Sequence, residues 1–309
     1  MKKIVIFNVG GALSSYGEIE GRKFMIDLGS SSDFSPIDDF LLPLTKVKYF
    51  ECRDGYYWID QLFLSHLDRD HISDYSKFSK SFYAQIMTCP NNNRGLRSEF
   101  QVHEELLGGE LETRESVLQH MRNKRRVEDH FNPLFSVIPS TSIYYLTPEY
   151  CYNEPDLKAS YANNISIAIY IRVGDKTVLF PGDLMKTGMS NLINTNGQFK
   201  YNLNRDGVDY LIAPHHGLQT SFSQDLFDNI TGNKTRLNII SEKTRSTESL
   251  ENRSNVDTRY YEERYSTGEN SLGQRGVKTS LGHIVIDFGL HETIIKQTNS
   301  IDEVIEEFK

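Results

Sequence analysis

The sequence predicts an α/β sandwich, in which β-sheets are covered by helices. Short apolar runs typical of strands occur in both halves of the chain, as in "KKIVIFNVG" at 2–10 and "KTVLFPGD" at 176–183. Segments with helical spacing of apolar residues lie between these runs. Several of the runs end directly in clusters of His and Asp, and the ends of strands are where a rigid scaffold displays reactive groups.

The first half of the chain contains strand signals separated by turns and one helix. We expect a strand at 2–10, a turn with a short hairpin arm, and a second strand at 23–31. A third, buried strand begins at residue 61 and runs into the polar loop 66–71. A short helix followed by a further strand is expected within 76–90.

The second half repeats this alternation of strands and helices. Gly174 and Asp175 form a strong hairpin signal between two of its strands. The strands, with the loops that follow them, are expected at 142–148, 165–174, 176–183, 208–217, 236–241, 282–289 and 291–298. The helices are expected at 184–194, 221–230, 255–268 and 301–309.

Residues 91–135 differ from the rest of the chain because they are charged and have a helical pattern. Their apolar residues, such as Leu107, Leu111 and Leu118, recur at helical spacing. We therefore predict a single domain over 1–309 with a charged helical insertion at about 91–135. The insertion is a candidate docking site for a regulatory protein partner.

The composition excludes several classes of function. No apolar run in the 309 residues approaches the roughly 18–20 residues that cross a bilayer, so we expect a cytoplasmic protein with no membrane contact. A net charge of −8 argues against a general electrostatic attraction to nucleic acid, although it is compatible with a local basic groove. The sequence does not predict whether the chain forms a homo-oligomer.

Three polar clusters that follow apolar strands together offer seven side chains of the kind that bind divalent metals. Imidazole and carboxylate groups are ligands of zinc, manganese and iron. The tight spacing of the first cluster lets neighbouring side chains face two different ions, and an aspartate from another strand can bridge them. The side chains are His66, Asp68, Asp70 and His71 in "SHLDRDH", Asp183 in "FPGDL", and His215 and His216 in "APHHG".

These motifs, in this order, resemble those of the metallo-β-lactamase fold superfamily, whose signature is H-x-H-x-D-H on a loop after a strand. The resemblance implies an αββα sandwich of two mixed β-sheets flanked by helices. It implies that Asp183 bridges the ions, that His216 is a metal ligand, and that His215 supports a ligand or transfers a proton. "FMIDLG" resembles an early motif of the family and places Asp27 beside the site, where it would orient a ligand.

Finer details resemble one branch of the superfamily, the soluble hydrolase domain of ComEC-type DNA-uptake proteins. "FNVGGA", "NNISIAIYI" and "KTSLGHIVI" are among the similar stretches. This branch has Asp at the position of Asp68, and N-x-S where other members have a third-motif histidine. Asn163, Asn164 and Ser166 occupy that region here and are candidates for contacts at the metal or around its ligands.

The chain departs from this branch in two respects. We expect a stand-alone domain without the membrane channel of the branch, so a role in DNA uptake is not expected. The histidine-bearing G-H-P motif expected after "IIS" is replaced by "SEKTRSTESLENRSN". Lys243, Arg245 and Lys278 are therefore candidates for binding phosphate in its place.

The ligand set predicts a metal-dependent nuclease or phosphodiesterase, and the branch resemblance favours DNA as its substrate. Asp68 makes the site richer in carboxylate, and hard oxygen ligands shift the expected ion from zinc toward manganese, with magnesium as a further candidate. One or two such ions would activate the water that attacks phosphorus. The catalytic candidates are Asp70, His215, Lys243 and Lys278.

Two alternatives remain open at this point. The chain hydrolyses a small molecule instead, such as a cyclic nucleotide, a lactone or a thioester. Alternatively, it is an effector component of a phage-defence or toxin-like system, in which a partner bound to the insertion holds the hydrolase inactive.

Overall fold

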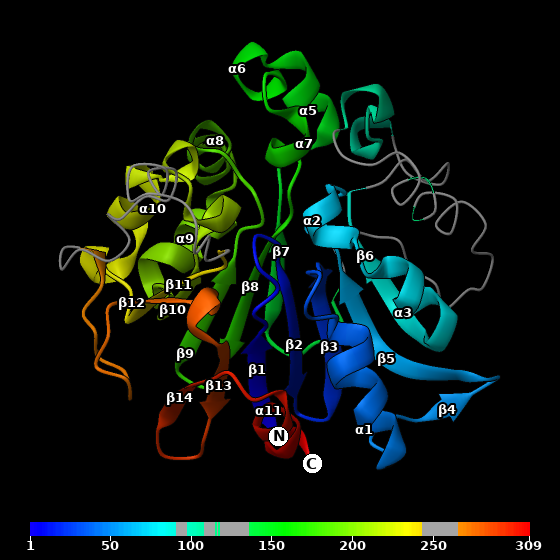
Figure 1. The fold of residues 1–309 in the computed structure, drawn as a ribbon. Coiled ribbons are helices and arrows are strands. Elements are labelled where there is room, and N and C mark those ends of the chain that lie inside the picture. Colours follow the sequence, from blue (N-terminus) through cyan, green and yellow to red (C-terminus); the bar gives the residue numbers. More distant parts are fainter. Residues whose placement is uncertain (91–97, 108–114, 116, 118–135, 243–264) are drawn as a thin grey trace.

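Two mixed β-sheets pack face to face, with helices on both outer faces (Figure 1). This arrangement, in a computed structural model that describes residues 1–90, 98–107, 115, 117, 136–242 and 265–309, confirms the predicted αββα sandwich. Helices α1 (Leu42–Lys46) and α3 (Tyr75–Ser81) lie beside the first sheet. Both termini lie at the end of the sandwich that carries α11 (Ile301–Phe308), opposite the end capped by α5–α7 (Figure 1).

Among the described residues, the first sheet has eight strands in the order β14-β13-β1-β2-β3-β5-β4, with β6 also pairing with β5. The second has six strands, in the order β12-β11-β10-β9-β8-β7. Strands β3, β5 and β6 are parallel to one another, as are β9 to β12. The bounds are β1 (Lys2–Ile6), β2 (Ser14–Ile19), β3 (Arg22–Leu28), β4 (Cys52–Arg53), β5 (Tyr56–Phe63), β6 (Phe82–Thr88), β7 (Thr141–Tyr144), β8 (Ala168–Val173), β9 (Lys176–Phe180), β10 (Tyr210–Ile212), β11 (Leu237–Ile240), β12 (Gly276–Lys278), β13 (His283–Phe288) and β14 (Thr293–Thr298).

Local sequence signals determine where several helices begin. The side chains of Thr147, Asn196 and Ser300 each accept a hydrogen bond from a backbone N–H of the first turn, as N-cap residues do. None of the helices in the described part of the chain has the length and apolar character needed to cross a membrane. The remaining helices are α2 (Arg69–Ile72), α5 (Pro148–Asn153), α6 (Pro155–Lys158), α7 (Tyr161–Asn164), α8 (Lys186–Thr195), α9 (Gly197–Asp206) and α10 (Gln224–Asn229), with short turns η1 (Pro36–Leu41), η2 (Ser98–Phe100), η3 (Glu104–Leu106), η4 (Pro214–Gly217), η5 (Gln219–Ser221), η6 (Thr231–Asn233) and η10 (Thr279–Leu281).

Alternating residues of the strands fill three apolar layers, because successive side chains of a strand point to opposite faces of its sheet. In β1, Ile4 and Ile6 belong to the layer between the sheets, whereas Val5 packs on the outer face of the first sheet. In β10, Ile212 points inward and Leu211 belongs to the layer under the helices of the second sheet. Most strands are therefore buried on both faces, and several of them, such as β1 and β9, are continuous apolar runs in the sequence.

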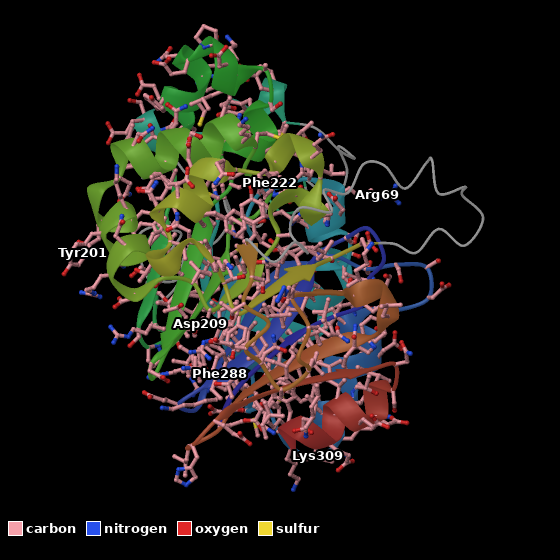
Figure 2. All side chains as sticks on the ribbon, turned by 90° about the vertical axis from the view of Figure 1, so that its left-hand side faces the viewer. Arg69, Tyr201, Asp209, Phe222, Phe288 and Lys309 are labelled. Atoms are coloured by element: carbon pink, nitrogen blue, oxygen red, sulfur yellow. The ribbon has the colours of Figure 1, made fainter. Side chains whose placement is uncertain are left out.

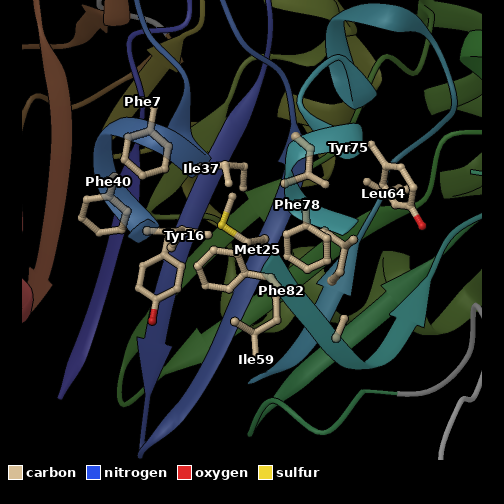
Figure 3. Packing of buried hydrophobic residues seen from close by; sticks show 14 of the residues in the cluster. Phe7, Tyr16, Met25, Ile37, Phe40, Ile59, Leu64, Tyr75, Phe78 and Phe82 are labelled. Atoms are coloured by element: carbon tan, nitrogen blue, oxygen red, sulfur yellow. The ribbon is translucent and has the colours of Figure 1, made fainter. Parts of the chain in front are cut away.

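Several aromatic side chains pack against one another in the outer layer of the first sheet (Figure 3). The ring of Phe40 lies 5.0 Å from that of Phe7 and 5.3 Å from that of Tyr16, measured between centroids. Phe78 stacks on Phe82 at 5.8 Å. Since burying one such side chain contributes about 1.5–3 kcal/mol, this layer holds η1 and α3 firmly against the sheet.

The structure confirms most of the expected elements. The 174–175 hairpin joins β8 to β9, and β13 and β14 form the closing hairpin. The predicted insertion at 91–135 lies largely outside the described residues, as does all of the predicted helix at 255–268 except its last four residues. The elements at 36–46, α5 to α7 and α9 were not predicted.

His283 introduces a pH dependence into the stability of this fold. Its ring packs against those of Phe7 and Phe34, and its Nδ1 accepts a hydrogen bond from the backbone N–H of Asn8 at 3.1 Å. Burial lowers the pKa of His283 to about 4. The unfolded chain, with a His pKa of about 6.5, therefore binds this proton more tightly than the folded chain, and stability falls as pH drops from about 6.5 to 4.

We expect this group to remove about 3 kcal/mol of stability between pH 7 and pH 4, because its pKa is about 4 in the folded chain and about 6.5 in the unfolded chain. The variant His283→Gln should show a pH dependence smaller by that amount when both proteins are unfolded by urea at the two pH values. His291→Gln, at an exposed position, is the control. Equal pH dependence in the wild type and His283→Gln would contradict this prediction.

Candidate metal centre

The carboxyl ends of parallel strands from both sheets meet at the edge of the sandwich nearest α7. The loop after β5 carries His66, and the loop after β9 carries Asp183. Two backbone hydrogen bonds join these loops to their neighbours: Ile167 N–H to the Ser65 carbonyl at 2.9 Å, and His215 N–H to the Gly182 carbonyl at 3.1 Å. Figure 2 shows Arg69, which precedes Asp70 in the sequence, in the half of the molecule away from the C-terminal Lys309.

The backbone at these loops is tightly constrained. Gly182 has φ of 60°, and a Cβ at this position would lie 2.9 Å from the Cβ atoms of Ser65 and Ser166. Only glycine allows the two loops to approach so closely. His215 and His216 also have positive φ, 48° and 56°, a conformation that is uncommon for residues with a side chain and that occurs at functional sites.

The carboxylate of Asp183 lies at the centre of the cluster, and its side chain is buried. Four histidines direct their Nε2 atoms toward it. The distances are 3.2 Å from His71 to Oδ1, and 3.7 Å from His66, 3.7 Å from His215 and 3.9 Å from His216 to Oδ2.

Two further carboxylates complete the surroundings of Asp183. Asp70 Oδ2 lies 3.0 Å from His216 Nε2, and Asp68 Oδ2 lies 3.6 Å from His66 Nε2. One ligand atom from each of Asp70, His71, Asp183 and His216 lies within 4.8 Å of every other in this set. The structure thus brings together all of the predicted metal ligands.

The other ring nitrogen of each histidine, Nδ1, is held by a protein group. Metal-bound histidines commonly have such a partner, which fixes the orientation of the ring. The partners are Ser65 Oγ at 3.2 Å for His66, Asp27 Oδ2 at 2.8 Å for His71, Ser221 Oγ at 3.1 Å for His215, and the Ser241 carbonyl at 3.1 Å for His216.

Several polar atoms of the cluster are buried without a hydrogen-bond partner among the described residues. They are His66 Nε2, His71 Nε2 and Asp68 Oδ1. His71 Nε2 is close to Asp183, but the two atoms are not in hydrogen-bond geometry. An unpaired buried polar group is costly, and the imidazole and carboxylate groups that carry these atoms fit a divalent metal as their common partner.

The charges of the histidines and aspartates in the cluster compensate one another. Burial opposes the charged form of His71, but Asp183 and Asp27 on its two sides hold its pKa well above the usual range. Burial would likewise raise the pKa of Asp183, yet His71, His216 and His66 hold it well below the usual range. The imidazoles and carboxylates thus favour one another's charged forms, and a bound cation would compete with the protons on the imidazoles.

Neighbouring charges also shift the pKa values of Asp70 and His216. Burial would raise the pKa of Asp70, but the hydrogen bond with His216 and the charge of His71 lower it to about 2. Burial would lower the pKa of His216, which Asp183 and Asp70 instead raise. In His215 burial prevails and the pKa is lowered, so its ring is neutral at pH 7.

Asp27 lies beside the cluster, as predicted, and contacts both Ser65 and His71. It is fully buried, and its Oδ1 accepts the backbone N–H of Ser65 at 2.6 Å. Its Oδ2 accepts the Ser65 hydroxyl at 2.8 Å and faces His71 Nδ1. Asp27 therefore sets the orientation of His71 relative to the end of β5.

The three residues of the third-motif region have different contacts. Asn163 Nδ2 lies 3.5 Å from His215 Nε2, whereas the amide of Asn164 bonds the Leu157 carbonyl and the Met185 N–H. Ser166 Oγ accepts the backbone N–H of Asp183 at 3.1 Å. Of the three, Asn163 reaches a histidine of the cluster, while Asn164 and Ser166 hold the loop around Asp183.

The predicted phosphate-binding residues are only partly described. Lys278, in β12, forms an ion pair with Glu242 at 2.5 Å, next to Ser241, whose carbonyl faces His216. Lys243 and Arg245 lie outside the described residues. The catalytic roles of Lys243 and Lys278 remain predictions.

Sequence reasoning did not single out the serines that position the histidines. Ser65, Ser221 and Ser241 each contact a ring nitrogen of the cluster. Ser65 and Ser221 stand within the motifs "SHLDRDH" and "APHHGLQTS", so their closeness to the ligands in the sequence was a usable signal. Ser241 contributes its backbone carbonyl, which any residue could provide.

No protein-family model matches the chain, and no curated protein matches its sequence. Among solved structures, it is similar to Igni18, a metallo hydrolase from Ignicoccus hospitalis, with 10% identity, a TM-score of 0.45, and coverage of 96% of this chain and 99% of that one. The metallo-β-lactamase fold protein YhfI from Bacillus subtilis is similar with 12% identity, a TM-score of 0.39, and coverage of 79% and 87%. An N-acyl homoserine lactone lactonase is similar with 12% identity, a TM-score of 0.35, and coverage of 65% and 88%.

Proposed function

We propose that the protein is a metal-dependent hydrolase that cleaves phosphodiester bonds, with DNA as the favoured substrate. One observation carries the proposal: the buried Asp183 carboxylate faces the Nε2 atoms of four histidines, three of them at 3.7 Å or less. A carboxylate surrounded in this way is the arrangement expected of a bridging ligand between two ions.

The surrounding residues divide into two donor groups that share Asp183. Asp70, His71 and His216 form one group, and His66 and Asp68 belong to the other. Divalent ions held there would supply a nucleophilic water at neutral pH and positive charge that stabilises a developing anion.

The balance of donors supports phosphodiester hydrolysis over hydrolysis of a lactone or thioester. Asp68 contributes oxygen in a position where nitrogen would be the alternative, and Asp70 and Asp183 add two more carboxylates. Hard oxygen donors favour Mn²⁺ or Mg²⁺ relative to a nitrogen-rich zinc site. Two-ion sites stabilise both the attacking and the leaving oxygen of a phosphoryl displacement, which is the step that phosphodiester cleavage needs.

Support for DNA comes from the resemblance to ComEC-type hydrolase domains. Arg69, exposed between Asp68 and Asp70, adds positive charge at the rim of the cluster, where an anionic substrate would approach. Control by a partner that binds the 91–135 insertion is a further part of the proposal, and cytoplasmic location fits such a substrate.

A substrate panel tests the proposal. Metal-loaded protein, with Mn²⁺ or Zn²⁺, is offered single- and double-stranded DNA, RNA, a cyclic dinucleotide, bis-p-nitrophenyl phosphate, an acyl homoserine lactone and a thioester. We expect cleavage of the synthetic phosphodiester and slow cleavage of free DNA, loss of both in Asp70→Ala, and retention of both in Asp175→Asn, whose side chain is 85% exposed. Turnover of the lactone or thioester alone would contradict the phosphodiesterase proposal, and rapid cleavage of free DNA would contradict control by a partner.

A further inference from the structure

As the sequence motifs define them, the two donor groups around Asp183 contain different numbers of side chains. One contains four side chains, Asp70, His71, Asp183 and His216. The other contains His66, Asp68 and the shared Asp183, because Asn163 occupies the region where a third-motif histidine is expected. The second group therefore has one protein donor fewer than the first, and an ion held by three protein ligands takes a further donor, either a side chain or water.

His215 is the remaining histidine that faces the shared carboxylate of Asp183. Its Nε2 is 3.7 Å from Asp183 Oδ2, the same distance as His66 Nε2 from that oxygen. Ligand bonds of about 2.0–2.2 Å to a tetrahedral ion place the ligand atoms roughly 3.3–3.6 Å apart, close to the distances seen here. The side chain of Asn163 lies 3.5 Å from the same Nε2, so His215 reaches the third-motif region from another loop.

The hydrogen bond at the other ring nitrogen points to the same role. Ser221 Oγ lies 3.4 Å from Met185 Sδ, to which its hydroxyl donates, so it accepts from His215 Nδ1–H at 3.1 Å. This leaves the lone pair of His215 on Nε2, directed at Asp183. His66, His71 and His216 are arranged in the same way, with Nδ1 held by protein and Nε2 directed at Asp183.

We propose that His215 is the fourth ligand of the ion held by His66, Asp68 and Asp183, in place of the missing third-motif histidine. Adjacent residues of one turn then serve different ions, with His216 on the side of Asp70. Ser221 is a positioning residue for His215. This inference rests on the metal-binding part of the proposed function and not on the choice of substrate.

Metal titration of the chelator-stripped protein tests the assignment without any substrate. Zn²⁺ is titrated by calorimetry, and the cobalt-loaded protein is examined by visible absorption. We expect wild type to bind two ions, and His215→Ala to bind one ion unchanged and the other roughly 100-fold or more weakly, since loss of a residue that merely supports a ligand already costs 10–100-fold. His216→Ala should weaken the other ion instead, and the two variants should change different cobalt bands.

Matched controls keep the result interpretable. His291→Ala, at an exposed position, should bind as wild type does. If His215→Ala does not fold by circular dichroism, Ser221→Ala decides the question: one ion weakened about tenfold supports the assignment, and unchanged binding overturns it. Binding of two ions by His215→Ala with wild-type affinity, or of one ion only by wild type, also overturns it. Two bound ions without phosphodiester cleavage would remove the proposed substrate and leave this assignment standing.

Discussion

Replacing Asp183 by asparagine is expected to abolish metal-dependent hydrolysis. Asparagine keeps the shape of the side chain but removes the charge that faces four imidazoles, at 3.2 Å from His71 and 3.7 Å from His66 and His215. Both donor groups share this carboxylate, so both lose affinity. Since the ions contribute several kcal/mol of transition-state stabilisation, the rate should fall about 10³-fold or more.

The measurement is the initial rate of bis-p-nitrophenyl phosphate cleavage at a fixed Mn²⁺ concentration. Asp175→Asn, the same change near the opposite end of β9, is the control and should keep the wild-type rate. If the Asp183→Asn variant folds and retains more than a tenth of the wild-type rate, the Asp183 carboxylate does not bridge the ions.

Replacing Asp27 by asparagine is expected to weaken metal binding, although Asp27 contacts Nδ1 of His71 and not the Nε2 atom that faces Asp183. Its two oxygens accept from the Ser65 N–H, the Ser65 hydroxyl and His71 Nδ1. The side chain of asparagine would direct its NH₂ group at one of these donors in place of an accepting oxygen. His71 would then lose its fixed orientation. We expect metal affinity to fall about 10–100-fold. The free energy of unfolding of the metal-free protein should fall by roughly 3–5 kcal/mol, because the pairing partner of a buried histidine is lost.

Calorimetric Zn²⁺ titration and urea unfolding of the metal-free protein measure these two effects. Asp33→Asn, at an exposed position in the loop that follows β3, is the matched control. Loss of stability with unchanged metal affinity would mean that Asp27 supports the fold but does not position His71.

The ligand cluster could be predicted because chemistry and spacing identify it in the sequence. "SHLDRDH" sets four donors on one loop, and Asp183 and His216 follow strands that are apolar enough to be recognised. The role of His215 could not be predicted in this way. It depends on the left-handed backbone at residues 215 and 216, which brings both adjacent side chains to Asp183 and places only that of His216 beside Asp70.

The layered fold could also be predicted, but the order of its strands could not. Short continuous apolar runs identify β1, β8, β9 and β13, whereas the pairing of β1 with β13 joins residues far apart in the sequence. Helix α9 escaped prediction because Phe199 and Leu203 are among the few buried residues of an otherwise polar segment. Tertiary packing of these few residues, and not a strong helical pattern, stabilises such an element.

Metal content tests the metal centre most directly. Wild type and Asp183→Asn are stripped with a chelator, loaded with Mn²⁺ or Zn²⁺, and desalted. Their metal content per chain is then measured by inductively coupled plasma mass spectrometry. Wild type is expected to retain about two ions per chain, as a shared carboxylate implies, and Asp183→Asn less than one. A wild-type chain that retains no metal, or an Asp183→Asn chain that retains as much as wild type, would contradict the assignment.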